Sequence, residues 1–176
     1  MRHFLGLVPP DGFTREVVAW QASLGHRITT PHVTVKAPDH LTPDRRWLPD
    51  VERACASHPP VEVTLTGVRT FGRRVVYLGV QGEGLRDLHL DLVGAVGAPL
   101  APFEGRRAFT PHLTLVLSRA PLGVSFDEAL ARATETFTTP VTFHATFVRL
   151  FRKPSPGGTY EVDRDLPLGR GALVGR

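Results

Sequence analysis

Cysteine and long apolar runs are both scarce in this chain of 176 residues. The only cysteine, Cys55, excludes an intramolecular disulfide and any zinc site built from several thiolates. Its place in an apolar helical pattern predicts a small buried side chain. No apolar run approaches the length of a membrane span, and the N-terminal apolar run is too short for a signal peptide. We therefore expect a cytoplasmic protein without a membrane partner.

The sequence also lacks the patterns of several common reactions. It has no G-x-S-x-G segment for a serine nucleophile and no Walker or dinucleotide-binding glycine pattern. The excess of one charge sign is small, because 21 Lys and Arg face 17 Asp and Glu for a net charge of +4. This balance admits a phosphate-bearing partner without requiring one.

The apolar periodicity predicts one α+β domain over residues 1–176. Its 41% hydrophobic content is ordinary for a packed globule. A capping box at Ser125–Glu128 marks the start of the last helix. Besides two strands discussed below, we expect strands over residues 3–8, 61–69, 74–80, 141–151 and 159–163, and helices over 11–24, 43–57, 85–96 and 126–137.

One hexapeptide pattern occurs twice, as Thr-Pro-His-Val-Thr-Val at 30–35 and Thr-Pro-His-Leu-Thr-Leu at 110–115. Proline suits the first residue of a strand, and the residues after it favour the pleat. Alternation then puts the histidine and the second threonine on one face and the aliphatic residues on the core face. A single such tripeptide would be an ordinary half-buried strand, but two copies indicate a shared functional role.

The repeated polar pairs are suited to phosphodiester chemistry. Histidine gives and takes protons near neutrality, so His32 and His112 can serve as an acid and a base. The hydroxyls of Thr34 and Thr114 can donate to non-bridging phosphate oxygens. By alternation Lys36 falls on the same face as Thr34, so it is a candidate for adding positive charge to the pocket. A solvent-exposed strand residue with no role in the pocket is an equally good interpretation.

Other candidates have a weaker basis. A two-histidine site lacks the third ligand that catalytic zinc requires, so we expect neither a metal nor a cofactor. Arg119 is a candidate for a substrate phosphate, against the alternative of surface charge. Phe4 and Tyr160 are candidates for stacking on a base, against the alternative of core packing.

The chain resembles the two-histidine phosphoesterase superfamily, which includes the 2′-5′ RNA ligases and RNA 2′,3′-cyclic phosphodiesterases. The likeness covers most of the length, and its ending is most similar to a branch of small bacterial phosphoesterases. It rests on residues 4–7, 31–36, 75–80, 109–115, 158–162 and 168–171.

The resemblance implies a bilobal, pseudo-twofold fold with two mainly antiparallel sheets flanking a central cleft and helices outside. It implies metal-independent action on a cyclic phosphate or a 2′-5′ linkage. We expect the partner to be an RNA end or a nucleotide with a cyclic phosphate, and the protein to be a monomer. In similar enzymes one histidine activates water and the other protonates the leaving oxygen, which would make His112 the base and His32 the acid. Many relatives carry arginine five places after the second histidine, where this chain has Leu117, with Arg119 two residues later.

Two alternatives remain open at the level of sequence. The same residues could serve reversible 2′-5′ RNA ligation or cleavage of an oligonucleotide. The cleft could instead bind RNA or nucleotides without turnover, which the net positive charge would favour.

Overall fold

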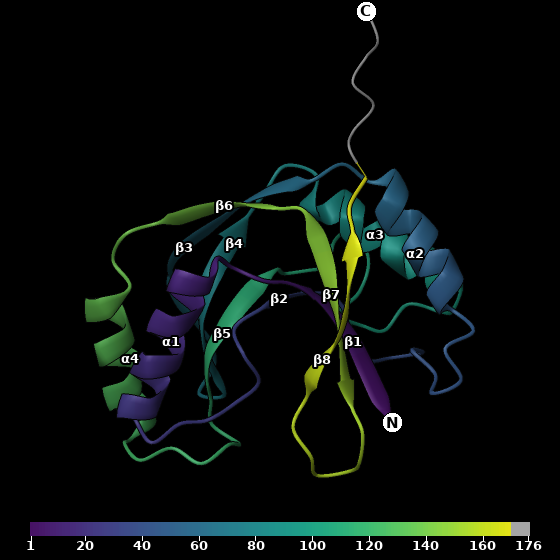
Figure 1. The fold of residues 1–176 in the computed structure, drawn as a ribbon. Helices are drawn as coiled ribbons and strands as arrows, with labels where there is room; N and C mark the ends of the chain where they lie inside the picture. Colours follow the sequence, from purple (N-terminus) through teal and green to yellow (C-terminus); the bar gives the residue numbers. More distant parts are fainter. Residues whose placement is uncertain (170–176) are drawn as a thin grey trace, which may run out of the picture.

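The computed structural model describes residues 1–169 (Figure 1). This part of the chain forms four helices and eight strands. In order they are β1 (Arg2–Leu7), α1 (Asp11–Ser23), β2 (Val33–Lys36), α2 (Leu48–Ser57), β3 (Val61–Phe71), β4 (Val75–Gln81), α3 (Leu85–Val96), β5 (His112–Leu117), α4 (Phe126–Thr136), β6 (Val141–Ala145), β7 (Phe147–Lys153) and β8 (Glu161–Pro167).

The strands of residues 1–169 form one curled antiparallel sheet in the order β6-β3-β4-β5-β2-β1-β7-β8 (Figure 1). The α+β class is therefore confirmed, but the prediction of two sheets is wrong. The two halves are joined because β2 pairs directly with β5, with Val33 opposite Leu113. The two strands that carry the histidine motifs are thus neighbours at the centre of the sheet.

The helices cover the sheet in two pairs (Figure 1). α2 and α3 contact each other, with α3 on β2 and α2 on β8, whereas α1 reaches β5 and α4 reaches β3 and β4. The rings of Trp20 on α1 and Phe137 at the end of α4 meet edge to face at 5.1 Å. Val33 and Leu113 are fully buried in the resulting core. The histidine motifs therefore present their polar side chains on the face of the sheet away from this core.

Three predicted elements differ from the observed ones. The expected strand 141–151 is broken at Thr146, because β6 pairs with β3 while β7 pairs with β1 and β8. Strand β8 begins at Glu161 and runs further than predicted. Helix α2 begins at Leu48 rather than near Pro43, with Pro49 in its first turn, where the missing amide proton costs nothing.

The start of α4 and the hairpin of β3 and β4 form where the local signals are strong. Ser125 caps α4 by accepting a hydrogen bond from the Glu128 amide at 3.1 Å, as the capping box predicted. The hairpin turns at Gly72, whose φ of 52° is left-handed. Helix α4 contacts both strands of this hairpin, and β4 pairs with the central strand β5.

Candidate active site

His32 and His112 line one open cavity of about 780 Å³ together with Thr34 and Thr114. The pairing of Val33 with Leu113 places Thr34 beside His112 and His32 beside Thr114, because residues on either side of an antiparallel pair also lie opposite each other. The two motifs that are distant in sequence thus converge on one surface. Convergence follows from strand pairing alone and does not require a bend in either strand.

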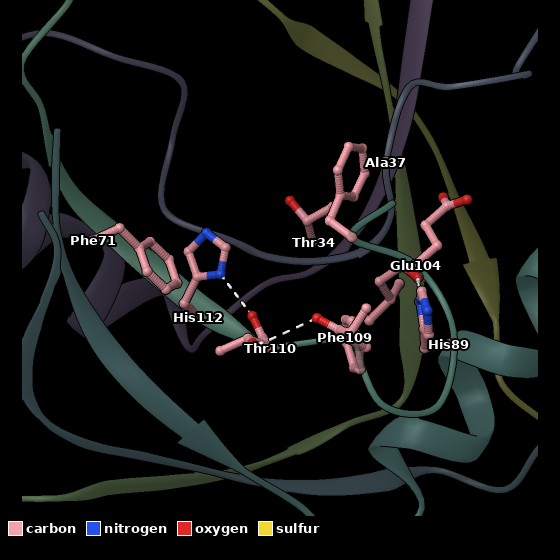
Figure 2. Close-up of a pocket in the computed structure, with 11 residues that line it drawn as sticks. Thr34, Ala37, Phe71, His89, Glu104, Phe109, Thr110 and His112 are labelled. Atoms are coloured by element: carbon pink, nitrogen blue, oxygen red, sulfur yellow. Dashed lines mark hydrogen bonds between the residues drawn. The ribbon is translucent and has the colours of Figure 1, made fainter. Parts of the chain in front are cut away.

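Both histidine rings are held in the same way. The Nδ1 of His32 lies 2.7 Å from the carbonyl oxygen of Thr30, and the Nδ1 of His112 lies 2.8 Å from that of Thr110. Figure 2 shows the second of these bonds. Since a carbonyl oxygen only accepts, each Nδ1 must carry the proton, and Nε2 is left as the exchangeable nitrogen.

The surroundings of both rings disfavour the imidazolium form. Burial lowers the pKa of His32 to about 4, and the neighbouring His112 acts in the same direction. Burial also lowers the pKa of His112. Both rings are therefore neutral at neutral pH in the unliganded protein, and an anion in the cavity would offset this effect.

Each histidine rests against aromatic rings from the neighbouring strand. Phe4 on β1 lies 4.6 Å from the His32 ring, and Tyr77 on β4 lies 5.4 Å from the His112 ring. Phe71, at the end of β3, meets His112 edge to face at 5.0 Å. Sequence reasoning did not assign Tyr77 or Phe71 to the site. The signal was present, because Phe4-Leu5-Gly6-Leu7 and Tyr77-Leu78-Gly79-Val80 are similar tetrapeptides.

The rim of the cavity carries positive charge. Arg2, Arg119 and Lys153 line it, and no Asp or Glu does so. Within residues 1–169, none of the three has a carboxylate within 4.0 Å. The cavity therefore combines two neutral imidazoles with cations that are available to an anion.

Comparison with known proteins identifies the group to which this arrangement belongs. Residues 9–155 match the sequence profile of the 2′-5′ RNA ligase superfamily. The chain belongs to this superfamily. No curated protein matches the chain.

Solved structures show the same fold at low sequence identity. TT0787 of Thermus thermophilus is 22% identical with a TM-score of 0.62, over 98% of this chain and 100% of that one. A structure described as a phosphoesterase is 19% identical with a TM-score of 0.62, over 96% and 98% of the two chains. E. coli LigT complexed with 3′-AMP is 18% identical with a TM-score of 0.61, over 96% and 98%.

The Lys36 side chain does not point into the cavity, although strict alternation along the strand would place it on the same face as Thr34. Lys36 is 1% exposed, and its Nζ lies 2.6 Å from Glu104 Oε1 and also donates to the carbonyls of Ala37 and Asp39. The cause is a β-bulge, since Gly6 pairs with Thr34 but Leu5 pairs with Lys36. The bulge shifts the next side chain to the buried side, so Lys36 is structural.

The second motif carries a bulge at the matching place. Tyr77 pairs with Thr114 but Val76 pairs with Val116, which leaves Leu115 as the extra residue of β5. Val116, the counterpart of Lys36, is fully buried. Both motifs therefore lose strict alternation directly after their second threonine.

The aromatic candidates Phe4 and Tyr160 both line the cavity, but they differ in how much of the ring a ligand can contact. Phe4 is 4% exposed and stacks on Phe151 at 4.5 Å, so its faces are occupied by Phe151 and His32. Tyr160 is partly exposed and meets Phe4 edge to face at 4.7 Å. Phe4 thus forms the floor under His32, and of the two, Tyr160 is the ring that a ligand can reach.

Three other polar side chains, Arg149, Arg152 and His144, do not line the cavity and lie beside carboxylates instead. Arg149 pairs with Asp165 and Arg152 with Glu161 across the β7–β8 pair. His144 lies 3.2 Å from Glu62 at the far edge of the sheet. By contrast, Arg119, the candidate for a substrate phosphate, does line the cavity, as does Leu117 two residues before it.

The described residues hold neither a metal-ligand cluster nor a membrane-spanning helix. No group of three or more His, Cys, Asp or Glu residues within 1–169 is arranged to hold a metal ion. Over the same range, no helix has the length and apolar character needed to cross a bilayer.

The cysteine predicted to be buried, Cys55, lies buried on α2, where burial raises the pKa of its thiol to about 12.

Proposed function

We propose that this protein is a metal-independent phosphodiesterase that opens 2′,3′-cyclic phosphate ends of RNA or nucleotides by acid–base catalysis with His32 and His112. The observation that carries the proposal is the shared cavity, in which both histidines are held by the same Nδ1 hydrogen bond. Membership of the 2′-5′ RNA ligase superfamily supports it. A structure of E. coli LigT contains 3′-AMP, a nucleotide with a phosphate on its ribose.

The proposed reaction assigns a task to each motif. The Nε2 of one neutral histidine takes a proton from water as the water oxygen bonds to phosphorus. The bond from phosphorus to one ribose oxygen breaks, and the Nε2–H of the other histidine protonates that oxygen. The hydroxyls of Thr34 and Thr114 donate to the non-bridging oxygens as negative charge grows on them.

The resemblance to similar enzymes makes His112 the base and His32 the acid, and we carry this order into the proposal. An anionic phosphate near Arg2, Arg119 and Lys153 favours uptake of the one proton that the acid needs. The order is open to a direct test, because a p-nitrophenyl leaving group departs without protonation. With such a phosphodiester, His32→Ala should regain much of its lost rate and His112→Ala should not.

The main experiment measures turnover of an oligonucleotide with a 2′,3′-cyclic phosphate end in the presence of chelator. His32→Ala and His112→Ala should each lose at least about 10²-fold in kcat, the usual contribution of one positioned proton-transfer group. His144→Ala is the matched control, since this histidine is exposed and distant from the cavity. Loss of activity on chelation, or full activity in either cavity variant, would contradict the proposal.

Reversible 2′-5′ ligation is the second candidate, and superfamily membership is the observation that favours it. A ribose 5′-hydroxyl would take the place of water as the nucleophile, with each histidine in the same role, and the two roles would be exchanged when the joined product is cleaved. Incubation of cyclic-phosphate and 5′-hydroxyl RNA ends, followed by product analysis, separates the two reactions. A joined product that requires both histidines would establish ligation.

A further inference from the structure

A smaller chamber opens beside His112 and has a different character from the main cavity. Its volume is about 330 Å³, within the range of roughly 300–1,000 Å³ that is typical of small-molecule sites. It shares Thr34 and His112 with the main cavity, so the two spaces adjoin at the proposed phosphate site. Figure 2 shows Phe71 and His112 at one end and Phe109, Glu104 and His89 at the other.

Three phenylalanines supply much of the chamber's wall. Phe109 is stacked face to face on His89 with a centroid separation of 3.9 Å. Phe71 is 37% exposed and Phe103 is 52% exposed, although both line the chamber. Single exposed rings are normal on a protein surface, but apolar surface gathered in one chamber beside a polar site is typical of a ligand-binding groove. The chamber therefore offers accessible aromatic surface next to a cationic cavity.

The most buried polar side chains of the chamber are already hydrogen-bonded. His89 bonds through Nδ1 to the Val35 carbonyl at 2.8 Å, and its Nε2 accepts the amide of Gly105 at 3.0 Å. Glu104 receives Lys36 on one carboxylate oxygen and the Ala101 amide on the other. These bonds hold the wall in place and leave little capacity for reading the edge of a ligand.

We propose that this chamber binds the nucleobase attached to the phosphate that His32 and His112 act on. The inference rests on the proposed function, because the occupant must be covalently linked to an anion in the adjoining cavity. A planar ring matches the aromatic wall, and stacking on aromatic side chains is tolerant of base identity. Because stacking strength rises with ring area, we expect purines to be preferred to pyrimidines, and because the buried polar groups are already bonded, little discrimination between adenine and guanine.

The test measures equilibrium binding of adenosine 3′-monophosphate and of inorganic phosphate, neither of which needs turnover. Phe103→Ala should weaken binding of the nucleotide by about 5- to 150-fold, the range for loss of one stacking ring, and leave binding of inorganic phosphate unchanged. Ala108→Trp, at an exposed residue of the wall, should have the same selective effect by filling the chamber. Leu100→Ala is the matched control, being 56% exposed on the same loop without lining the chamber.

Each outcome decides one of the two proposals separately. Equal affinities of adenosine 3′-monophosphate and inorganic phosphate, or equal losses for both ligands, would overturn the base site. Stronger binding of uridine than of adenosine or guanosine 3′-monophosphate would overturn selection by ring size. Selective weakening of nucleotides by Phe103→Ala, in a protein that opens no cyclic phosphate, would support the base site and overturn only the reaction.

Discussion

The central residues of this protein are two imidazoles whose protonation is set by their backbone and their burial. A carbonyl oxygen two residues earlier fixes Nδ1–H in each ring, so that Nε2 alone exchanges protons. The aromatic neighbours Phe4 and Tyr77 restrict each ring from one side. Orientation and tautomer are thus determined before any substrate arrives.

The lowered pKa values of His32 and His112 lead to a prediction about pH. An acid–base pair needs one proton in total, and the singly protonated pair, whichever ring holds that proton, is most abundant between the two pKa values of the pair. Since the pKa of His32 is about 4 and that of His112 is also below its usual 6.5, kcat/KM should form a bell with its maximum below pH 6.5. Rates over pH 4–9 with a cyclic nucleotide check this.

The same bell should persist in His144→Ala, because that histidine lies outside the cavity. In His32→Ala or His112→Ala the residual rate should lose one limb of the bell. A maximum at pH 8 or above in the natural sequence would be incompatible with the pair described here.

At the scale of elements, the bulges of β2 and β5 decide what the strands present. Each motif gives the cavity a histidine and a threonine and then turns its next residue into the interior. On β2 that residue is Lys36, whose charge is balanced by Glu104 from the loop before β5. The buried pair therefore ties the loop that carries Phe103 and Phe109 to a central strand.

This ion pair gives a prediction about stability. Both side chains are 2% exposed, so Lys36→Met leaves an unpaired buried carboxylate and should lower the free energy of unfolding by about 3–5 kcal/mol. The double variant Lys36→Met with Glu104→Leu should recover most of that loss, because no buried charge remains. Urea unfolding of the three proteins measures both effects.

A surface pair of the same kind serves as the control. Arg73 and Asp127 are each 69% exposed, so Arg73→Met should change the free energy of unfolding by no more than about 1 kcal/mol. If Lys36→Met were equally mild, the pair would not organise the loop.

At the scale of the whole molecule, charge is distributed to leave cations at the cavity. Arg149 and Arg152 are occupied by carboxylates on the neighbouring strand, whereas Arg2, Arg119 and Lys153 line the cavity without such partners within residues 1–169. These three cations give the side of the sheet that carries the histidines a local positive charge. An RNA end would be attracted to this side of the sheet.

The three cavity cations predict how binding of single-stranded RNA depends on salt. Each phosphate contact contributes about −0.7 to the slope of log K against log salt concentration, so three contacts should give a slope of about −2. Arg119→Gln should reduce the slope by about 0.7. Arg15→Gln, at an exposed residue of α1 that does not line the cavity, should leave it unchanged. Titrations from low to moderate salt in the His112→Ala background measure the slope, and a slope near zero would show that these cations do not bind the RNA.

Local sequence signals predicted those elements whose cause is local. The capping box at Ser125 placed the start of α4, and the hairpin around Gly72 was readable from its alternating flanks. The break at Thr146 was not readable, because each half of that β-rich run is equally suited to a strand. Only the choice of different partners, β3 for one half and β1 with β8 for the other, separates them.

The sequence by itself determined that His32, Thr34, His112 and Thr114 are equivalent pairs, because duplication and strand alternation are both written in the order of residues. Only the tertiary structure decided that one sheet, joined between β2 and β5, brings the pairs together. It also decided that Lys36 is buried with Glu104, since a bulge depends on the register of two strands. Register and burial arise from contacts between distant segments, which no local pattern specifies.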